Sequence, residues 1–509
     1  MYSLSRKNLV RNLLRDILII LVLALSVSAV IIPKELNDLD ELWNYNFARN
    51  IADGLLPYNG FNMVTTPLLS MICGMILNLT FNELIVMRVL AVCLITAILY
   101  ITYKVFELLE INQYVTYILL ICMYMLMENY FRIDYNFGVL LIALITLYYE
   151  LKQISRGKEL VETDYKDIFI GILVGSSILF KQTTGVFLSA IFVSYKLLLV
   201  NRERNIKNIL KIIGIRLLGV IIPIIGFSIY VSVNGIWNDF LDYTVYSLNT
   251  FSNKISYLNL INGNYGIHIA ILSILVPAMI ITMFIIFACK KLENKQCKNI
   301  FILFAYSIAT FIVVYPISDS IHFLIGAFCT LIGSEYFGWL LLKNNQFSKG
   351  QLLLLKCVKY LFFLIALIII SYSVVALTSY IKTCTEYKNL KHFKYIPVLS
   401  ENVQIIDDYI IEQNKQGKDV YILDATAALY MIPLDKYNKD YDMFNIGNIG
   451  SRGEEGQIDK LESIENTILL IMNDKYKRNW QNPERVRRYI MESWVKTGEI
   501  QNFDIYEKY

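Results

Sequence analysis

The sequence predicts a polytopic α-helical membrane protein with a small α/β domain at its C-terminal end. Charged residues make up only 18% of the 509 residues, and the mean hydropathy is +0.48. Soluble proteins carry about 25% charged residues, and a chain of this length could not cover a water-exposed surface with so few. Many apolar segments also reach the roughly 17–25 residues that a membrane helix needs. After about residue 385 the composition becomes that of a soluble protein.

The apolar segments fall into two length classes. Those long enough to cross the membrane are 16–32, 88–106, 114–131, 212–233, 266–289, 299–315, 321–342 and 356–378. Those that are shorter are 67–81, 137–150, 168–180 and 184–200. Together they predict a bundle of about 11–12 membrane segments.

Clusters of basic residues predict the orientation, because Lys and Arg concentrate on the cytoplasmic side of membrane spans. The first fifteen residues and segment 202–216 are both strongly basic, so we place them in the cytoplasm. Counting from there puts the loops 33–66 and 234–265, and everything after about residue 379, outside. The expected location is a bacterial cell membrane, since the richness in Lys, Ile, Asn and Tyr is typical of AT-rich bacterial genomes.

This orientation requires that one apolar segment early in the chain does not cross. The weakest is 67–81, which begins at Pro67 and is interrupted by Gly74 and Asn78. We therefore predict that it is short, re-entrant or strongly tilted. Eleven crossings would then place the N-terminus inside and the C-terminal domain outside.

The tail alternates between helical and strand patterns. Helices are expected at 401–416, near 457–464 and at 483–495, and strands at 419–423, 467–472 and around 500–506. This alternation predicts a small α/β domain. The predicted organisation is thus a membrane domain over residues 1–384, whose first outer loop is 33–66, and an extracytoplasmic domain over residues 385–509.

Composition excludes several kinds of site. The net charge of +4 is too small to indicate nucleic acid as a partner. The eight cysteines lie mostly in apolar segments without CxxC spacing, and the three histidines are scattered, so no metal cluster is expected.

The first outer loop carries the clearest candidate for catalysis. A helix is expected from about 39 to 53, with Asp38 and Glu41 spaced as a capping box. Asp40 instead shares a helix face with Trp43 and Phe47, and a carboxylate on an aromatic face beside the membrane could act as a general base. The alternative is that these acids only complement the helix N-terminus.

Four further residues are candidates for substrate binding at the outer face. Lys181 lies between two apolar segments, where a cation either binds an anionic ligand or extends to the interface. Arg132 and Asp134 sit at an outer helix junction, and they could line a site or only order a turn. His322 begins a late span, where it could contact phosphate or sugar or be an ordinary interfacial histidine.

The first loop resembles that of the GT-C membrane glycosyltransferases, in particular protein O-mannosyltransferases and bacterial lipid A aminoarabinose transferases. The resemblance rests on DELWNYNFARNIADGLLPYNGF followed by TTPLL, and on the Lys in GILVGSSILFKQTTGVFL. It covers roughly residues 15–200. One departure is that Thr65-Thr66 stands before Pro67, where the family has a lysine.

The resemblance implies a GT-C-like bundle and transfer of a sugar, with inversion, from a polyprenyl-phosphate donor to an acceptor on the outer face. It implies that Asp40 is the base with Glu41 as its neighbour, that Lys181 contacts the lipid phosphate, and that Asp134 supports the site. The partners would be the lipid-linked sugar, membrane lipid and a glycan, lipid or protein acceptor of the cell envelope. The lipid-linked sugar is a co-substrate and no other cofactor is implied, while any need for a divalent metal stays open.

Other classes of membrane protein remain as alternatives. A polysaccharide or lipid transporter or flippase would tend to show two related halves and polar groups at mid-membrane, whereas no half-repeat is visible here. A polysaccharide polymerase or ligase would also use lipid-linked sugars. A mere membrane anchor for the C-terminal domain would not need eleven spans.

Overall fold

In the computed structural model of the protein, the chain forms two compact units. The structure describes residues 2–34, 36, 38–158, 164–199, 206–249, 254–289, 294–343, 368, 371–375, 377–378, 388–392, 401–438, 441–477 and 483–508. Unit 1 comprises residues 1–32, 89–225 and 255–379, and unit 2 comprises residues 33–88, 226–254 and 380–509. Each unit is treated separately below.

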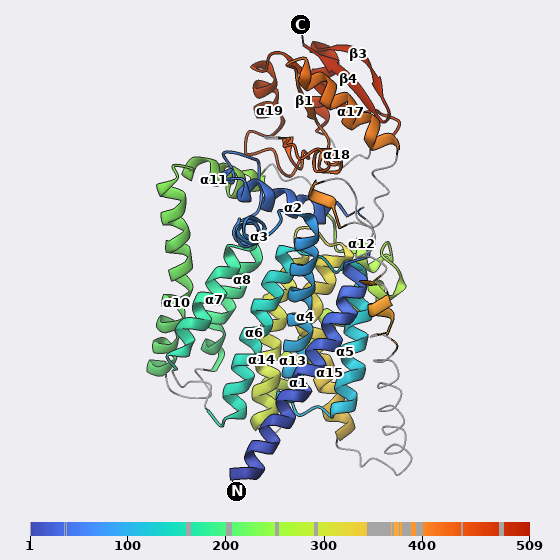
Figure 1. Ribbon diagram of the computed structural model, residues 1–509. Coiled ribbons are helices and arrows are strands. Elements are labelled where there is room, and N and C mark those ends of the chain that lie inside the picture. The colour runs from blue at the N-terminus through green and yellow to red at the C-terminus, as the bar shows by residue number, and fades with distance from the viewer. Residues whose placement is uncertain are drawn as a thin grey trace. The chain divides into compact units, whose positions relative to one another are not determined.

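Long apolar helices build most of unit 1. Seven helices of the described chain are long and apolar enough to cross a membrane: α1 (Tyr2–Ile31), α4 (Leu84–Leu108), α6 (Tyr135–Ser155), α10 (Ile206–Val233), α13 (Ile267–Cys289), α14 (Asn294–Phe311, extended by η4, Ile312–Val314) and α15 (Ser320–Lys343). Within unit 1 these helices run side by side as one bundle (Figure 1). The protein is therefore a multi-pass membrane protein, as its composition predicts.

Shorter helices occupy the other predicted segments that the structure describes. They are α3 (Leu68–Leu79), α5 (Gln113–Met127, followed by η1, Glu128–Tyr130), α7 (Lys166–Ile178) and α8 (Gln182–Ser194, followed by η2, Tyr195–Leu199). The 12 residues of α3 span roughly 18 Å, less than the roughly 30 Å of hydrocarbon in a bilayer. The prediction that segment 67–81 is short is confirmed, whereas segment 356–378 falls largely outside the described residues.

The outward face of the bundle is apolar, as expected for a surface that contacts lipid. On α10 alone, Leu210, Leu218, Ile225 and Ile229 are each more than half exposed. A contiguous apolar surface of this kind would be a liability in water, but it is the expected surface in contact with lipid.

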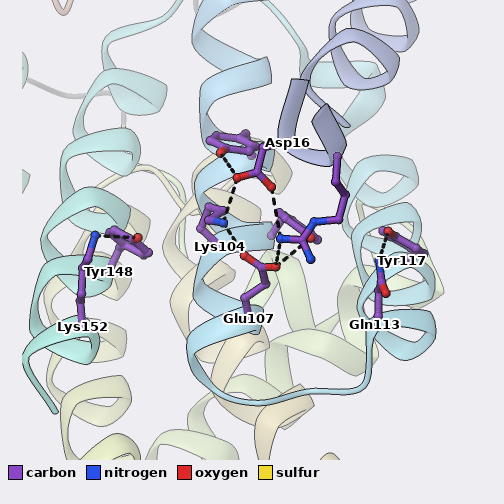
Figure 2. A network of polar contacts seen from close by, with 10 residues as sticks. Asp16, Lys104, Glu107, Gln113, Tyr117, Tyr148 and Lys152 are labelled. Carbon is purple, nitrogen blue, oxygen red and sulfur yellow. Dashed lines mark hydrogen bonds and ion pairs between the residues drawn. The ribbon is translucent and has the colours of Figure 1, made fainter. Parts of the chain in front are cut away.

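Charged side chains join α1 to α4 in a compact network (Figure 2). Lys104 lies 3.2 Å from Asp16 and also pairs with Glu107, which lies 2.5 Å from Arg15. The hydroxyl of Tyr100 donates to Asp16 at 3.3 Å. The network contains two cations and two carboxylates, so its net charge is zero. It can therefore join the two helices without placing a net charge between them.

A second network, almost fully buried, holds α6, α7 and α10 together. Arg216 on α10 pairs with Glu150 of α6 and lies 3.0 Å from Asp167 of α7, and it donates to the carbonyl of Phe192 at 2.8 Å. All three charged side chains are at most 4% exposed. The sequence predicts Arg216 to belong to a basic cytoplasmic cluster, and within unit 1 its side chain is buried in ion pairs with Glu150 and Asp167.

Arg216→Ala should destabilise the protein strongly, because the two buried carboxylates Glu150 and Asp167 would lose the guanidinium that pairs with both of them. The expected loss is about 3–5 kcal/mol of unfolding free energy, measured by thermal unfolding in detergent. Lys211→Ala is the matched control, since Lys211 is an exposed basic residue on the same helix. Equal stability of the two variants would contradict the structural role of Arg216.

Unit 2 combines the helices of the loops 33–66 and 234–265 with the C-terminal domain. The loop helices are α2 (Leu39–Ala52), α3, α11 (Trp237–Thr244) and the turn η3 (Tyr246–Asn249), while α12 (Leu258–Ile261) belongs to unit 1. The predicted boundary between residues 384 and 385 lies outside the described residues. The compact unit that holds the tail also takes in 33–88 and 226–254.

The C-terminal domain is a four-stranded sheet with helices packed against it. Its elements are η5 (Lys388–Leu390), α17 (Glu401–Lys415), β1 (Asp419–Ile422), α18 (Ala427–Met431), α19 (Gly453–Glu462), β2 (Thr467–Met472), α20 (Glu484–Ser493), β3 (Val495–Ile500) and β4 (Phe503–Glu507). The strand order is β1-β2-β4-β3, with β1 and β2 parallel and the other pairs antiparallel. The burial pattern explains the order, because β2 is buried along its whole length while β3 is an exposed edge.

Candidate functional site

The predicted site residues fall into both units, with the first-loop acids in unit 2 and the cations in unit 1. In unit 2, α2 begins at Leu39 with Asp38 as its N-cap, whose carboxylate accepts from the backbone N–H of Asp40 at 3.2 Å. The helix and its cap are where the sequence predicts them. Asp40 is only partly buried, whereas Trp43 and Phe47 are at most 9% exposed. Of the two acids in the first turn of α2, Asp40 is the more accessible.

Glu41 has a different environment. It is 4% exposed, and its two carboxylate oxygens accept from Arg88 Nε at 2.7 Å and from Arg88 Nη2 at 3.0 Å. Arg88, in the first turns of α4, also donates to the carbonyl of Lys34 at 2.5 Å. The predicted capping box is therefore wrong in its second half, because Glu41 pairs with Arg88 rather than closing over the helix start. A bidentate, buried pair of this kind fixes geometry.

The buried face of α2 packs on a polar segment of the C-terminal domain. Trp43 Nε1 donates to the carbonyl of Ala425 at 3.0 Å, and Asn50 Nδ2 donates to Asp442 Oδ2 at 3.1 Å. Burial raises the pKa of Asp442 to about 6, although Asn50 and Arg49 oppose the shift. The guanidinium of Arg49 is fully buried, donates to the carbonyl of Lys436 at 2.5 Å and lies 4.4 Å from the ring centroid of Tyr437. The C-terminal domain therefore positions the helix that carries Asp40.

The loop after α2 is held by aromatic packing. Tyr58, at the end of the segment Gly54-Leu55-Leu56-Pro57-Tyr58, is buried and has a φ of 72°, which is rare for a bulky residue. Its hydroxyl donates to the carbonyl of Thr65 at 2.9 Å. Its ring lies 5.5 Å from Phe240 and 6.5 Å from Tyr243 of α11. The turn is thus held by packing of Tyr58 against α11.

In unit 1, Lys181 lies at the turn between α7 and α8, as the N-cap residue of α8. Its ammonium donates to Asn136 Oδ1 at 2.8 Å and lies 5.6 Å from the ring centroid of Tyr135. Partial burial lowers the pKa of Lys181 to about 8, and the carboxylates of Asp134 and Asp319 oppose the shift. A lysine with this pKa is a cation whose charge is readily perturbed near neutral pH.

The other three predicted binding residues lie around the same position. Asp134 is 3% exposed and caps α6 by accepting from the N–H of Asn136 at 2.6 Å, while its second oxygen lies 3.7 Å from Arg132 Nε. His322 Nδ1 lies 2.8 Å from Asp319. Burial opposes ionisation of Asp319, but hydrogen bonds from His322 and the charge of Arg132 hold the pKa of Asp319 below its usual value.

The structure thus brings Lys181, Arg132, Asp134 and His322 into one group within unit 1. Sequence reasoning missed Asn136 and Asp319, which connect the members of this group. Asp319 lies three residues after the cis-proline Pro316 and three before His322, and Asn136 sits two residues after Asp134, so each lies close in the sequence to a predicted site residue. In the part of the chain that the structure describes, no three His, Cys, Asp or Glu side chains form a group that could hold a metal ion.

Comparison with known proteins addresses the fold. No protein-family model matches the sequence, and no curated protein matches it. Two solved structures of ArnT from Cupriavidus metallidurans, one in the apo state and one bound to undecaprenyl phosphate, are similar with a TM-score of 0.55 at 11% identity. Each covers 96% of this chain and 97% of the ArnT chain. The protein has the GT-C fold.

A further solved structure, an oligosaccharyltransferase from Archaeoglobus fulgidus, has a TM-score of 0.48 at 12% identity, over 89% of this chain and 68% of that chain. The GT-C fold confirms the predicted fold class, a membrane bundle followed by a small α/β domain. The similarity in fold does not test the individual site residues, and their roles stay predictions.

Proposed function

We propose that the protein is a GT-C membrane glycosyltransferase that moves a sugar from a polyprenyl-phosphate donor to an acceptor on the outer face of the membrane. The observation that carries the proposal is the similarity to ArnT over 96% of the chain, together with the undecaprenyl phosphate bound in one of those structures. The acceptor is a glycan, lipid or protein of the cell envelope. The proposal includes no cofactor beyond the lipid-linked sugar.

In the proposed reaction Asp40 accepts the proton of the acceptor hydroxyl. The oxygen attacks the anomeric carbon from the side opposite the phosphate, the bond between that carbon and the phosphate oxygen breaks, and the phosphate leaves with the electron pair. The configuration at the anomeric carbon therefore inverts. Because phosphate is already a good leaving group, one base and cationic stabilisation suffice. The accessibility of Asp40 and the pairing of Glu41 with Arg88 support Asp40 as the base.

The leaving phosphate gains negative charge as the reaction proceeds, since a phosphodiester with one charge becomes a monoester with up to two. Lys181 and Arg132 are assigned to this phosphate, with His322 as a further hydrogen-bonding group. Both cations already face carboxylates, so the cluster is close to neutral. Their interaction should strengthen in the transition state more than in the ground state, which is how such contacts accelerate a reaction.

The decisive experiment incubates the purified protein with a panel of undecaprenyl-phosphate sugars and envelope glycans, lipids or peptides. Mass spectrometry detects the glycosylated acceptor, and NMR determines its anomeric configuration. Formation of an inverted product supports the proposal. Movement of lipid-linked sugar across vesicle membranes without any covalent product would instead make the protein a transporter, and a retained configuration would contradict the single-base mechanism.

Donor binding should weaken as the pH rises above about 8. Phosphate binding favours the charged form of Lys181, and its pKa of about 8 means that this form is lost above that pH. The dissociation constant for a hydrolysis-resistant polyprenyl phosphodiester, whose own charge is constant in this range, should rise by up to about tenfold per pH unit between pH 8 and 10. Titration calorimetry or fluorescence with the detergent-solubilised protein measures it.

Lys181→Arg is the control for this pH dependence, because arginine stays protonated throughout. That variant should bind the phosphodiester with an affinity that changes little between pH 7 and 10, whatever its absolute strength. Identical pH profiles for the wild type and Lys181→Arg would refute the assignment of Lys181 to the phosphate.

A further inference from the structure

Asp319 and His322 form a side-chain pair at the start of α15, within unit 1. Asp319 precedes the first residue of α15, and its Oδ1 accepts from the backbone N–H of His322 at 2.9 Å, as the side chain of an N-cap does. The same oxygen lies 2.8 Å from His322 Nδ1. The side chains of Asp319 and His322 are 25% and 13% exposed. The pair is therefore partly open to its surroundings.

Each side chain of the pair has one further polar atom, Asp319 Oδ2 and His322 Nε2. Neither atom has a hydrogen-bond partner among the residues that the structure describes. Neither atom is fully buried. A bound molecule can therefore reach both of them.

The contact with Asp319 determines which nitrogen of His322 carries the proton in the neutral ring. Burial opposes ionisation of Asp319, but the hydrogen bonds from His322 and the charge of Arg132 hold the pKa of Asp319 below its usual value. Asp319 is thus a carboxylate at neutral pH and can only accept, so Nδ1 of His322 is the donor. The neutral ring then has its lone pair on Nε2. The pair therefore presents two acceptors, one from each side chain.

The loop before α15 is held from two sides. Ile255 donates its N–H to the carbonyl of Pro316 at 3.2 Å and accepts at its own carbonyl from the N–H of Ser318 at 3.1 Å. The hydroxyl of Tyr130 donates to Ser320 Oγ at 2.7 Å. These contacts fix the chain on which the two acceptors stand, and a pre-organised site loses less entropy when a ligand binds.

The charge of Asp319 acts on both cations that are assigned to the donor phosphate and on a nearby tyrosine. Burial lowers the pKa of Lys181 and the carboxylate of Asp319 opposes this shift, while Arg132 in turn lowers the pKa of Asp319. Burial, and next the charge of Asp319, raises the pKa of Tyr265. Tyr265 is partly exposed, so its ring offers a flat apolar surface on which a sugar ring can pack. Asp319 therefore lies near both the phosphate-binding cations and an aromatic ring.

We propose that Asp319 and His322 bind hydroxyl groups of the donor sugar and so determine which sugar the enzyme accepts. The proposal rests on the proposed function, in which Lys181 and Arg132 hold the donor phosphate, because the sugar is bonded directly to that phosphate. Two acceptors match two hydroxyl donors, whereas a carboxylate oxygen and an imidazole lone pair both repel a phosphate oxygen. His322 is thus given to the sugar rather than to the phosphate. A site that hydrogen-bonds a substrate hydroxyl also rejects analogues that lack it.

Asp319→Asn tests the proposal on the full-length protein in detergent. Asparagine is about as good an N-cap as aspartate, so the start of α15 is preserved, but its amide nitrogen replaces the free acceptor Oδ2 with a donor. The probes are undecaprenyl-phosphate glucose, mannose and galactose, and undecaprenyl methyl phosphate, which has the same charge and no sugar. The variant should bind the preferred sugar lipid about 10–100-fold more weakly than the wild type does. Its affinity for the methyl phosphodiester should stay the same or rise, because a negative charge near the cations is removed. Titration calorimetry measures both affinities.

Asp38→Asn is the matched control, because it makes the same change at the N-cap of another helix, α2, and it should bind all four lipids like the wild type. His322→Phe keeps a ring at the position but has no acceptor, and it covers the case in which Asp319→Asn disturbs folding. It should show the same selective loss of affinity for the sugar lipid. Monodeoxy analogues of the preferred sugar then identify the hydroxyls that are bound. Removal of a hydroxyl that Asp319 contacts should weaken binding to the wild type but not to Asp319→Asn.

Equal weakening of the sugar lipids and the methyl phosphodiester in both variants, or no weakening in either, overturns the proposal. So does a wild type that binds every sugar lipid no more tightly than the methyl phosphodiester. Sugar transfer by such a protein would leave the glycosyltransferase function standing and remove only sugar recognition by Asp319 and His322. Sugar-selective binding that depends on Asp319, without transfer to any acceptor, would retain the sugar site and refute the proposed function.

Discussion

Asp40→Asn should leave the protein folded and its donor affinity unchanged while lowering the rate of sugar transfer by about 10²–10⁴-fold, the usual contribution of a general base. The amide has nearly the shape of the carboxylate but cannot accept the acceptor proton. Because Asp38 rather than Asp40 caps α2, the helix start should be preserved. Steady-state kinetics with a saturating lipid-linked donor measures the effect, which should appear in kcat.

Asp38→Asn is the matched control for this experiment. It makes the same change of charge two residues away, and Asn is about as good an N-cap as Asp. Transfer by Asp38→Asn should stay within a few-fold of the wild type. If both variants lose activity equally, the effect comes from the local negative charge and not from a base at Asp40. Full activity of Asp40→Asn would remove Asp40 from the mechanism.

The sequence predicted those helices and strands whose ends are determined by residues close by in the chain. The helix from about 39 to 53 has a cap at one end and Gly54 at the other, and the structure places it at Leu39–Ala52. Segment 67–81 has a proline at its start and polar interruptions, and it forms only the 12 residues of α3. In the tail, the predicted helix 401–416 and strands 419–423 and 467–472 match α17, β1 and β2 within one residue.

Features that depend on distant residues were not predictable in this way. The helix expected at 483–495 ends at Ser493, because the chain from Val495 pairs with β4 as an edge strand and completes the sheet. Nothing in the pattern around Arg88 or Arg49 reveals their partners, since Glu41 lies 47 positions and Lys436 lies 387 positions away in the chain. Long-range pairings of this kind decide the site, because they hold the first-loop helix in unit 2.

The contacts of α2 suggest that its two acidic residues, Asp40 and Glu41, have different roles. Glu41 is buried and engaged on both oxygens, so a proton transfer at Glu41 would first have to break the pair with Arg88. Asp40 is partly exposed and is the more accessible of the two. We therefore expect Glu41, the neighbour of the proposed base, to act as a positioning residue for Asp40.

Arg88→Ala should cause the largest loss of stability in unit 2, about 3–5 kcal/mol, because it leaves the buried carboxylate of Glu41 without its counter-charge. It also removes the donor to the carbonyl of Lys34, which fixes the chain just before α2. Thermal unfolding in detergent measures the stability of the variant. Arg88→Lys should recover part of it, since one ammonium cannot reproduce the two parallel hydrogen bonds of a guanidinium.

A double-mutant cycle separates the positioning role of Glu41 from catalysis. Glu41→Gln and Arg88→Ala should each destabilise, and Glu41→Gln combined with Arg88→Ala should lose less than the sum of the two, because neither buried charge is then left alone. Glu41→Gln should also retain the pH profile of transfer that the wild type shows, with a reduced rate, since the titrating base is Asp40. A Glu41→Gln variant that is as stable as the wild type but as inactive as Asp40→Asn would instead assign the chemistry to Glu41.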